Sequence, residues 1–504
     1  MRLSDSQHMR DADSAAIHII GIPSDLLMTN AAGHIARAAS EIMKSPSAVI
    51  LCGSGNNGGD GVASALYLTR WGVKCRVFLV GRREKMTHDT LEMERRLISL
   101  GGHLEDFDPD SPEMPVLLKS AGVIIDAIFG IGLSRELSGA PLTAVRLINA
   151  SGAPVVSADI ASGVDADTGR IMGDAVRAAR TVTFSRAKPG HFVEPGCTCC
   201  GELSVVDIGI PDDLAEKSEI DVHAVQAGDI TLPLRPRVSH KSDYGRLAII
   251  GGSVGYTGAP SLCARAALRS GSGLVNIGVP ESIYQITAVK NDEAMPFPLA
   301  ADADGRISAG AIPAVLEKLD SCTAAVIGPG MGRSDELTEL MRQVVSSGTS
   351  PLIIDADGLF ALSRDMNMLK AARRTVILTP HEGEFVRMGG TLTGDRLSDA
   401  RSFAQKHGCI LVLKGHRTIT AFPGGGIYIN TCGNPGMAKG GSGDVLAGII
   451  GALACQLPAD KAVISAVWLH SRAGDLCAET LGEYSMLPTD IIEALPRAFQ
   501  SARS

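Results

Sequence analysis

The sequence predicts a two-domain α/β protein in which each domain is a three-layer structure with a central parallel sheet. The chain has 504 residues, which is too long for one ordinary hydrophobic core. Short apolar runs of strand length alternate with helix-length segments through both halves, and the runs are almost continuously apolar. Such runs are typical of strands that helices cover on both faces of a parallel sheet.

Six strands are predicted in the first half, in short runs that are rich in β-branched residues. They are residues 48–52, 75–80, 123–126, 155–159, 181–184 and 203–208. The same pattern predicts six strands in the second half, at residues 247–250, 274–279, 324–327, 352–355, 376–378 and 410–413. Their alternation with helix-length segments indicates parallel sheets, because parallel neighbours need crossover connections.

A polar segment that contains prolines separates the two halves. Residues 211–219 are mostly polar, and residues 232–240 hold two prolines and three basic residues. Stretches of this composition are typical of loops and domain joins. We therefore place the join at about residues 220–240, with one domain over residues 1–220 and the other over residues 230–504.

The composition indicates a globular enzyme and argues against several other classes. Hydrophobic residues make up 45% of the chain and charged residues 20%, as in ordinary soluble domains. The net charge of −8 argues against a nucleic-acid partner, which usually requires a basic surface. The apolar runs are too short to cross a bilayer, and the first ten residues lack the apolar core of a signal peptide. We expect a cytoplasmic protein that binds neither membranes nor nucleic acid.

Cysteines cluster at only one place, residues 197–200 with the sequence CTCC. A zinc site would need a second cluster at a suitable spacing, and the sequence shows none. We expect free thiols in a reducing compartment.

Polar residues mark the ends of three predicted strands in the first half. The glycine-rich residues 53–61, GSGNNGGDG, follow the first strand and precede a helix-like segment at residues 62–71. Such a loop is by itself a weak nucleotide signal. Asp126 and Asp159 end two later strands, and Ser162 follows closely. Because the carboxyl ends of parallel strands meet at one edge of a sheet, these three side chains and Asn57 are expected to converge. An oxygen-rich cluster of this kind suits a hard cation.

Three motifs of the first half, CGSGNNGGDG at residues 52–61, DAIFGIGL at 126–133 and DIASGVD at 159–165, resemble the NAD(P)H-hydrate epimerase domain. Residues 9–17 resemble the opening helix of that domain. The resemblance covers about residues 1–215 and implies a Rossmann-like fold. One departure is residues 28–32, MTNAA, where the family more often shows an acidic residue and a glycine.

The resemblance implies roles for residues of the first domain. Asn57, Asp126 and Ser162 would hold a potassium ion. Asp159 would contact the hydrated nicotinamide ring and act as acid and base while the C6 hydroxyl is removed and replaced. Two segments would bind the hydrate, the first made of Asn56, Asn57, Gly58, Gly59 and Asp60, and the second of Gly130, Ile131, Gly132, Leu133, Ser134, Arg135 and Glu136.

A second glycine-rich stretch, NPGMAKGGSGD at residues 434–444, leads into the apolar residues 445–453. The small residues at 440–443 allow backbone N–H groups to approach a ligand. A helix that begins at about Asp444 would place these groups at its positive end, where a phosphate binds. The carboxylate of Asp444 would then lie beside the phosphate, where it could deprotonate a substrate hydroxyl.

This stretch resembles the signature of the ribokinase-like superfamily, and the second half resembles the ADP- or ATP-dependent NAD(P)H-hydrate dehydratase of that fold over about residues 235–500. The supporting motifs are HKSDYGR at 240–246, IIGGS at 249–253, YTGA at 256–259, GPGMG at 328–332, DADG at 355–358, LTPHEGE at 378–384 and LKGHRT at 413–418. Ser242 and Glu382 depart from the small or proline residues expected there.

The resemblance implies that Asp444 is the catalytic base and that Mg²⁺ accompanies the nucleotide. The hydrate would be bound by Ala259, Gly332, His381 and Asp444. The nucleotide would be bound by Lys414, Gly415, His416, Arg417, Thr418, Gly440, Gly441, Ser442 and Gly443.

Together the two resemblances imply one bifunctional repair enzyme. The first domain would epimerise the C6 hydroxyl of hydrated NADH or NADPH, and the second would dehydrate the S epimer with ADP or ATP. We expect a homo-oligomer. Two alternatives remain: a small-molecule kinase, since related kinases share the Gly-x-Gly-Asp sequence, and a binding role for a first domain without catalysis. The choices between ADP and ATP and between the two hydrates stay open.

Overall fold

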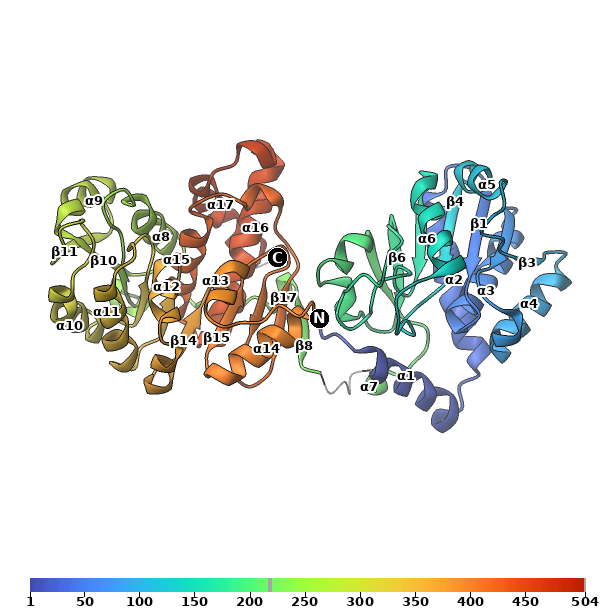
Figure 1. The fold of residues 1–504 in the computed structure, drawn as a ribbon, viewed down its shortest axis with the longest axis horizontal. Coiled ribbons are helices and arrows are strands. Elements are labelled where there is room, and N and C mark those ends of the chain that lie inside the picture. Colours follow the sequence, from blue (N-terminus) through green and yellow to red (C-terminus); the bar gives the residue numbers. More distant parts are fainter. Residues whose placement is uncertain (216–219, 503–504) are drawn as a thin grey trace. The chain divides into compact units, whose positions relative to one another are not determined.

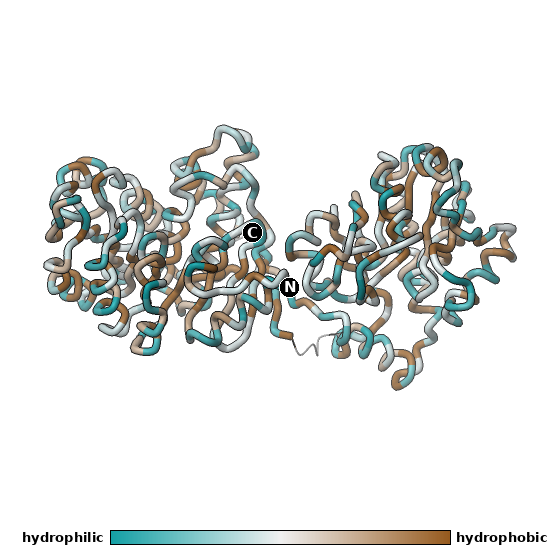
Figure 2. The backbone as a smooth tube through the Cα atoms, in the orientation of Figure 1, coloured by the Kyte–Doolittle hydropathy of each residue, from teal (hydrophilic) through white to brown (hydrophobic). Residues whose placement is uncertain are grey.

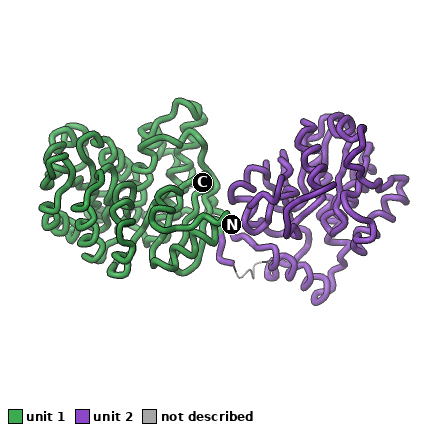
Figure 3. Tube along the Cα trace, viewed as in Figure 1, with its two compact units in different colours: residues 1, 223–504 green, residues 2–222 purple. Residues whose placement is uncertain are grey.

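The computed structural model describes residues 1–215 and 220–502, which divide into two compact units (Figure 3). Residues 2–222 form the first unit, and residues 223–504 with Met1 form the second unit. Within the polar segment at residues 211–219 that we assigned to the join, residues 216–219 lie outside the described residues.

The first unit is built on a parallel sheet with the strand order β3-β2-β1-β4-β5-β6-β7 (Figure 1). Its strands are β1 (Ser47–Cys52), β2 (Lys74–Leu79), β3 (Leu104–Asp106), β4 (Val123–Ala127), β5 (Val155–Ala158), β6 (Arg180–Phe184) and β7 (Glu202–Val206). Its helices are α1 (Ser6–Ala15), α2 (Ser24–Ile42), α3 (Asn56–Arg70), α4 (His88–Ser99), α5 (Met114–Ser120), α6 (Gly139–Ser151) and α7 (Asp212–Ala215). The strand order reverses between β1 and β4, which makes this pair the point where such sheets bind ligands.

Helices cover both faces of this sheet. Ile50 and Cys52 of β1 pack in a core with α2, α3 and α4, whereas Val49 and Leu51 pack in a second core with α5 and α6. Successive side chains of a strand point to opposite faces, so two covered faces require the continuous apolar run that the sequence shows. Figure 2 shows apolar segments along the strands inside this unit.

The second unit is built on a mixed sheet with the order β11-β10-β9-β12-β13-β14-β15-β16-β17-β8. Its strands are β8 (Val222–Val225), β9 (Arg246–Ile250), β10 (Leu274–Pro280), β11 (Met295–Leu299), β12 (Ala324–Ile327), β13 (Leu352–Ile354), β14 (Val376–Leu378), β15 (Ile410–Leu413), β16 (Ile419–Ala421) and β17 (Ile427–Asn430). The pairs from β11 to β15 are parallel, and β16 runs antiparallel to both β15 and β17.

The helices of the second unit again lie on two faces of the sheet. They are α8 (Gly258–Arg269), α9 (Tyr284–Lys290), α10 (Ile312–Asp320), α11 (Asp335–Ser346), α12 (Asp357–Ser363), α13 (Glu382–Arg387), α14 (Arg396–His407), α15 (Ser442–Ala454), α16 (Ala459–Ser485) and α17 (Pro488–Ser501). Leu247 and Ile249 of β9 pack in one core with α8, α15, α16 and α17. Ala248 and Ile250 are buried on the other face, and α10 packs against β9. Among the described residues, no helix combines the length and the apolar character needed to cross a bilayer.

The predicted fold class is confirmed, and every run predicted to be a strand is a strand to within two residues at either end. Five strands have no counterpart in the prediction. β3 is short and polar, and β11 carries two prolines, which edge strands tolerate. The antiparallel strands β16 and β17 follow a loop that we treated only as a binding segment. β8 lies within the segment that we assigned to the join.

Candidate active sites

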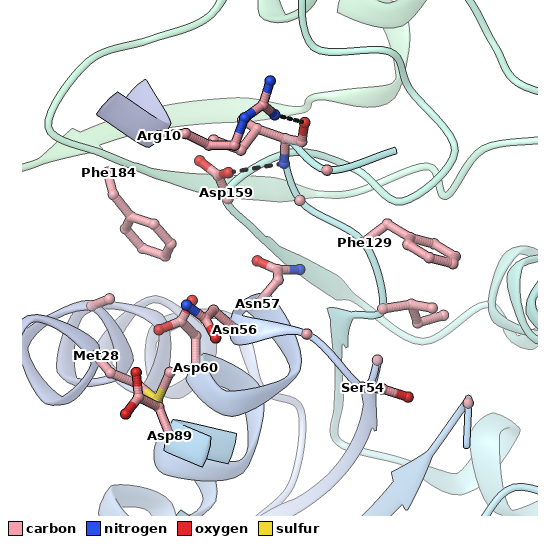
Figure 4. A pocket seen from close by; sticks show the side chains of 18 of the residues that line it. Arg10, Met28, Ser54, Asn56, Asn57, Asp60, Asp89, Phe129, Asp159 and Phe184 are labelled. Atoms are coloured by element: carbon pink, nitrogen blue, oxygen red, sulfur yellow. Dashed lines mark hydrogen bonds between the residues drawn. The ribbon is translucent and has the colours of Figure 1, made fainter. Parts of the chain in front are cut away.

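A cavity of about 950 Å³ opens in the first unit at the carboxyl ends of β1, β4 and β5 (Figure 4). Of the residues expected to bind the hydrate, those that line the cavity are Asn56, Asn57, Asp60, Gly130, Ile131, Gly132, Arg135 and Asp159. Gly58, Gly59, Leu133, Ser134 and Glu136 do not line it, and Leu133 belongs to the hydrophobic core. The helix α2, which contains the departure from the family pattern at residues 28–32, lines the cavity with Leu27, Met28 and Ala31.

Close backbone packing explains two glycines of this region, Gly53 directly after β1 and Gly58 in the first turn of α3. A Cβ at Gly58 would lie 1.8 Å from the carbonyl oxygen of Gly53, and a Cβ at Gly53 would lie 2.0 Å from that of Ile128. Neither position can carry a side chain without moving the backbone. Gly55, by contrast, caps α3 with open space where its Cβ would be. The loop is therefore held tightly at two points and leaves room for a ligand at the third.

Asp159 occupies a strained backbone position directly after β5. Its φ is +65°, a left-handed conformation that few residues other than glycine adopt, although aspartate tolerates it better than most. The N–H of Asp159 donates to the carbonyl oxygen of Val182 at 2.7 Å, which ties it to β6. This geometry places the carboxylate on the cavity wall, and backbone strain of this kind is commonly found at functional sites.

The carboxylate of Asp159 forms a buried ion pair with Lys188. Oδ1 accepts from Lys188 Nζ at 2.6 Å and from Thr183 Oγ1 at 3.0 Å, and Oδ2 accepts from the N–H of Ile131 at 3.3 Å. Lys188 is 1% exposed. Burial acts to raise the pKa of Asp159, but the charge and the hydrogen bond of Lys188 outweigh it and hold this pKa below its ordinary value. The carboxyl is thus ionised at neutral pH.

His191 supports the same pair as a neutral ring. Its Nδ1 accepts from the N–H of Lys188 at 3.0 Å, so the proton is on Nε2, which donates to the carbonyl oxygen of Asp159 at 2.9 Å. Burial and the nearby positive charge of Lys188 lower the pKa of His191 to about 4. The ring therefore fixes the backbone of both partners without adding charge.

The sequence did not identify Lys188 as a site residue, because Lys188 lies in a loop, four residues after the end of β6. The signal that could have found it is its place beyond β6, the neighbour of β5 in the sheet order. A polar residue near the carboxyl end of a parallel strand adjacent to Asp159 would have been a candidate.

Asp126 and Ser162, two of the three expected cation ligands, hydrogen-bond each other. Asp126 is fully buried, and its oxygens accept from the hydroxyls of Ser157 at 2.8 Å and Ser162 at 2.5 Å and from the N–H of Ser162 at 2.9 Å. Among the described residues, no cationic side chain pairs with this carboxylate, and burial raises its pKa.

Asn57, the third expected ligand, lies beside the β5 carbonyl of Ala158. In one orientation its amide nitrogen donates to this carbonyl oxygen at 3.2 Å and its amide oxygen accepts from the N–H of Gly130 at 3.3 Å. The first orientation satisfies both ends of the amide, because the other orientation would set the amide oxygen against the carbonyl oxygen of Ala158 and the amide nitrogen against the N–H of Gly130. A buried carboxylate without a paired cation and a set of oxygen donors fit a hard monovalent cation.

The second site lies at the amino end of α15, which begins at Ser442, two residues before the expected start. Gly441 caps the helix with a φ of +103°, a conformation that favours glycine. Among the described residues, no carbonyl oxygen accepts from the N–H groups of Gly440, Gly441, Gly443 or Asp444. A Cβ at Gly440 would meet open space. These free donors at the positive end of a helix form a site for an anion.

Asp444 has a raised pKa because of its surroundings. Burial is the largest cause, the carboxylate of Asp355 adds to it, and Lys414 opposes it, so that the pKa of Asp444 is about 7. Asp357 also raises it slightly. A carboxyl with this pKa is half ionised near neutral pH and can act as a general base there.

Lys414 and Asp355 form an ion pair beneath the same loop. Lys414 Nζ donates to Asp355 Oδ1 at 2.9 Å, and Thr379 Oγ1 donates to the same oxygen at 2.7 Å. A Cβ at Gly443 would lie 3.2 Å from Lys414 Nζ, so glycine leaves the ammonium accessible from the loop. The sequence identified Asp355 and Asp357 only as parts of a motif, and their convergence with Asp444 depends on the order of β13, β14 and β15.

Other residues with predicted roles lie around this pair. His381 caps α13, where its Nδ1 accepts from the N–H groups of Gly383 at 3.0 Å and Glu384 at 3.3 Å. The N–H of Gly332 donates to Asp357 Oδ2 at 2.9 Å. Ala259 lies at the start of α8, 3.1 Å from the Cβ position of Gly330. Gly415, His416, Arg417 and Thr418 connect β15 to β16.

Family models match both units. Residues 24–190 match the model described as YjeF-related protein N-terminus, and residues 247–497 match the model described as NAD(P)H-hydrate dehydratase. Among solved structures, the ADP/ATP-dependent NAD(P)H-hydrate dehydratase of Bacillus subtilis, co-crystallised with ATP and Mg²⁺, is 30% identical. That similarity covers 56% of this chain and 99% of the other, with a TM-score of 0.49.

Curated relatives match along the full length. The bifunctional NAD(P)H-hydrate repair enzyme of Thermofilum pendens is 37% identical over 100% of this chain and 97% of its own length. The enzyme of the same description from Moorella thermoacetica is also 37% identical, over 98% and 96%. Identity at this level over both units shows that the chain belongs to the family of bifunctional NAD(P)H-hydrate repair enzymes.

Proposed function

We propose that this protein restores NADH and NADPH from their hydrates in two reactions. The first unit epimerises the C6 hydroxyl of the hydrated ring, and the second unit dehydrates the S epimer at the expense of ADP or ATP. The observation that carries this proposal is the presence of both sites on one chain. One is a buried Asp159–Lys188 pair in a large cavity, and the other is Asp444 beside free helix N–H groups.

Epimerisation requires that one hydroxyl leaves and another enters from the opposite face. The ring nitrogen expels the C6 hydroxyl as water once an acid protonates it, which leaves a ring cation. Water then adds to C6 from the other face and gives up a proton. Asp159 and Lys188 share a hydrogen bond of 2.6 Å and can act together, one proton being given and one recovered in each cycle.

Asn57, Asp126 and Ser162 would hold the potassium ion that we propose for the first unit. The buried carboxylate of Asp126, with which no cationic side chain among the described residues pairs, supports this assignment, as does the hydroxyl of Ser162 beside it. When bound, the ion would supply a fixed positive charge close to the ring and to phosphate-bearing parts of the substrate.

Dehydration requires a better leaving group than hydroxide. Asp444 would take the proton of the C6 hydroxyl while its oxygen attacks the terminal phosphorus of the nucleotide and the phosphoanhydride bond breaks. The free N–H groups of Gly440, Gly441, Gly443 and Asp444 would stabilise the charge on the transferred phosphoryl group. Phosphate then leaves with the C6 oxygen, pushed by the ring nitrogen, and loss of a proton from C5 restores the dihydronicotinamide.

Lys414 is placed to bind a phosphate of the donor, since its ammonium lies beneath Gly443. The nucleotide would be faced by the residues from Gly415 to Thr418. The hydrate would be bound by Ala259, Gly332 and His381. Mg²⁺ would accompany the nucleotide, and the carboxylates of Asp355 and Asp357 supply oxygens of the kind it prefers.

The test is to incubate the full chain with mixed epimers of each hydrate and either nucleotide. We expect the near-ultraviolet absorbance of the dihydronicotinamide to recover completely, with one phosphate released for each molecule restored. Without nucleotide, chromatography should show the two epimers interconverting. A stable phosphorylated product would instead identify a small-molecule kinase, and recovery limited to one epimer would identify a first unit without catalysis.

A further inference from the structure

The lining of the cavity in the first unit includes two cationic side chains on one short segment, Arg82 and Lys85, to which no role has been given. We infer that they bind the 2′-phosphate on the adenosine ribose and make the epimerase favour hydrated NADPH over hydrated NADH. This inference rests on the proposed function, because it assigns one end of the same dinucleotide substrate.

The sheet order indicates how a dinucleotide lies in the cavity. The order β3-β2-β1-β4-β5-β6 is that of a doubly wound dinucleotide-binding sheet, in which the ligand crosses the switch point between β1 and β4. Gly53, Gly55 and Gly58 have the G-x-G-x-x-G spacing of its pyrophosphate-binding turn, with close packing at the first and third glycines and open space at the second.

The position of Asp159 fixes the direction of the substrate. Asp159 follows β5, on the β4 side of the switch point, so the reacting ring lies there and the adenosine extends past β1 toward β2. In doubly wound sheets the segment after β2 contacts the adenosine ribose. An acidic residue there hydrogen-bonds a free 2′-hydroxyl, and an arginine accommodates a 2′-phosphate.

Arg82 is held firmly in that segment. Its N–H donates to Ser54 Oγ at 3.1 Å, and the same hydroxyl donates to its carbonyl oxygen at 3.1 Å. A Cβ at Gly81 would lie 2.3 Å from Ser54 Oγ, so glycine permits this contact. The N–H of Thr87 donates to the carbonyl oxygen of Ser54 at 3.1 Å. The segment that carries Arg82 and Lys85 is therefore attached to the pyrophosphate-binding turn.

The segment 82–85 carries one acidic residue, Glu84, which does not line the cavity, and three cationic residues of two kinds. Arg83 is already neutralised by Glu94 at 2.7 Å and Asp106 at 2.8 Å, and it does not line the cavity. Arg82 and Lys85 line the cavity, and among the described residues neither side chain has a hydrogen bond or an ion pair. Two unpaired cations at the end of β2 suit a doubly charged phosphate.

The acidic side chains of the cavity lie elsewhere on its wall. Asp60 and Asp89 gather near Met28, well apart from Ser54, to which Arg82 is bonded (Figure 4). Among the lining residues at 80–85, none is acidic. Phe107 also lines the cavity, and its N–H donates to the carbonyl oxygen of Leu79 at the end of β2 at 3.0 Å.

The experiment measures epimerisation of each hydrate without added nucleotide, so that the dehydratase is silent. We expect wild type to favour the NADPH hydrate in kcat/KM. Arg82→Gln with Lys85→Gln should raise KM for that hydrate about 10- to 100-fold, the range expected for lost charge-assisted hydrogen bonds. The kcat should change little because the contact is remote from the ring, and KM for the NADH hydrate should stay within about two-fold. Arg83→Gln, which removes one positive charge from the same segment, should leave the preference between the two hydrates unchanged.

A binding measurement provides an independent readout. Adenosine 2′,5′-bisphosphate should inhibit epimerisation by wild type more strongly than adenosine 5′-monophosphate, and the double variant should lose this difference. The inference would be overturned if the double variant lost the same share of kcat/KM for both hydrates. It would also be overturned if the preference of the double variant between the hydrates equalled that of wild type. Wild type that epimerises neither hydrate would overturn the proposed function itself, and thermal unfolding would confirm that each variant is folded.

Discussion

At the scale of single residues, the two proposed catalytic aspartates have opposite environments. Asp159 faces the ammonium of Lys188, which holds the pKa of the carboxyl below its ordinary value. Asp444 faces the carboxylate of Asp355, and burial with this repulsion raises its pKa to about 7. The same side chain is thereby kept ionised in one site and poised to exchange a proton in the other.

The pKa of Asp444 predicts how dehydration depends on pH. The carboxylate form is the base, so kcat/KM for dehydration of the S epimer should rise through about pH 7 and then level off. Asp444→Asn should lower this rate by about 10² to 10⁴-fold while epimerisation stays intact. The measurement is the rate of absorbance recovery on the purified epimer from pH 5 to 9. A variant that dehydrates at nearly the normal rate would exclude Asp444 as the base.

The thermal stability of Asp444→Asn at two pH values provides an independent test of the raised pKa of Asp444. A carboxyl whose folded pKa exceeds its unfolded pKa favours the folded state below the unfolded value, and this benefit is lost as the pH rises through about 7. Asp444→Asn removes the buried charge, so it should raise the midpoint of thermal unfolding at pH 8 and have less effect at pH 5. A variant that is less stable at both pH values would contradict this expectation.

At the scale of structural elements, the site residues that the sequence could predict in the first unit lie mostly at the ends of strands. Asp126 and Asp159 stood out because each ends a continuous apolar run, a pattern that is visible without knowing the fold. Lys188 and the Lys414–Asp355 pair could not be found in this way, since their contacts depend on which strands are neighbours in the sheet. The strands β3 and β11 were missed because polar residues and prolines replace the apolar pattern there.

Asp126 joins β4 to the segment after β5, which makes this junction the place to test the cation. Replacing potassium by a large organic cation in the buffer should slow epimerisation, and adding potassium should restore it, because the buried carboxylate would lose its counter-charge. Dehydration of the purified S epimer should not change. Epimerisation at the same rate without potassium would show that this reaction does not depend on a bound potassium ion.

Asp126→Ala is the accompanying variant, and it should weaken epimerisation even with potassium present. Because Asp126 also accepts hydrogen bonds from Ser157 and Ser162, this variant should lose stability as well. Ser157→Ala removes one of these bonds but no expected ligand. It therefore serves as the matched control, and it should retain its response to potassium.

At the scale of the whole molecule, each compact unit holds the side chains that we propose for one half of the repair. The cavity with Asp159 is lined by residues of the first unit, and Asp444, Asp355 and Lys414 all belong to the second. The sequence predicted this division because strand patterns repeat on both sides of a polar segment. It could not fix the boundary closely, since β8 interrupts that segment.

Because the two sites are separate, two full-length variants that each lack one activity should complement each other in solution. Asp159→Ala should consume only the S epimer, and the R epimer should persist apart from slow spontaneous inversion. Asp444→Asn should interconvert the epimers without restoring NADH or NADPH. An equal mixture of the two variants should consume both epimers, because the epimer made by one chain can diffuse to the dehydratase site of another. Chromatography of both epimers over time, with each variant alone as the control, measures this. If the mixture left the R epimer behind while wild type consumed it, the two reactions would require both sites on the same chain.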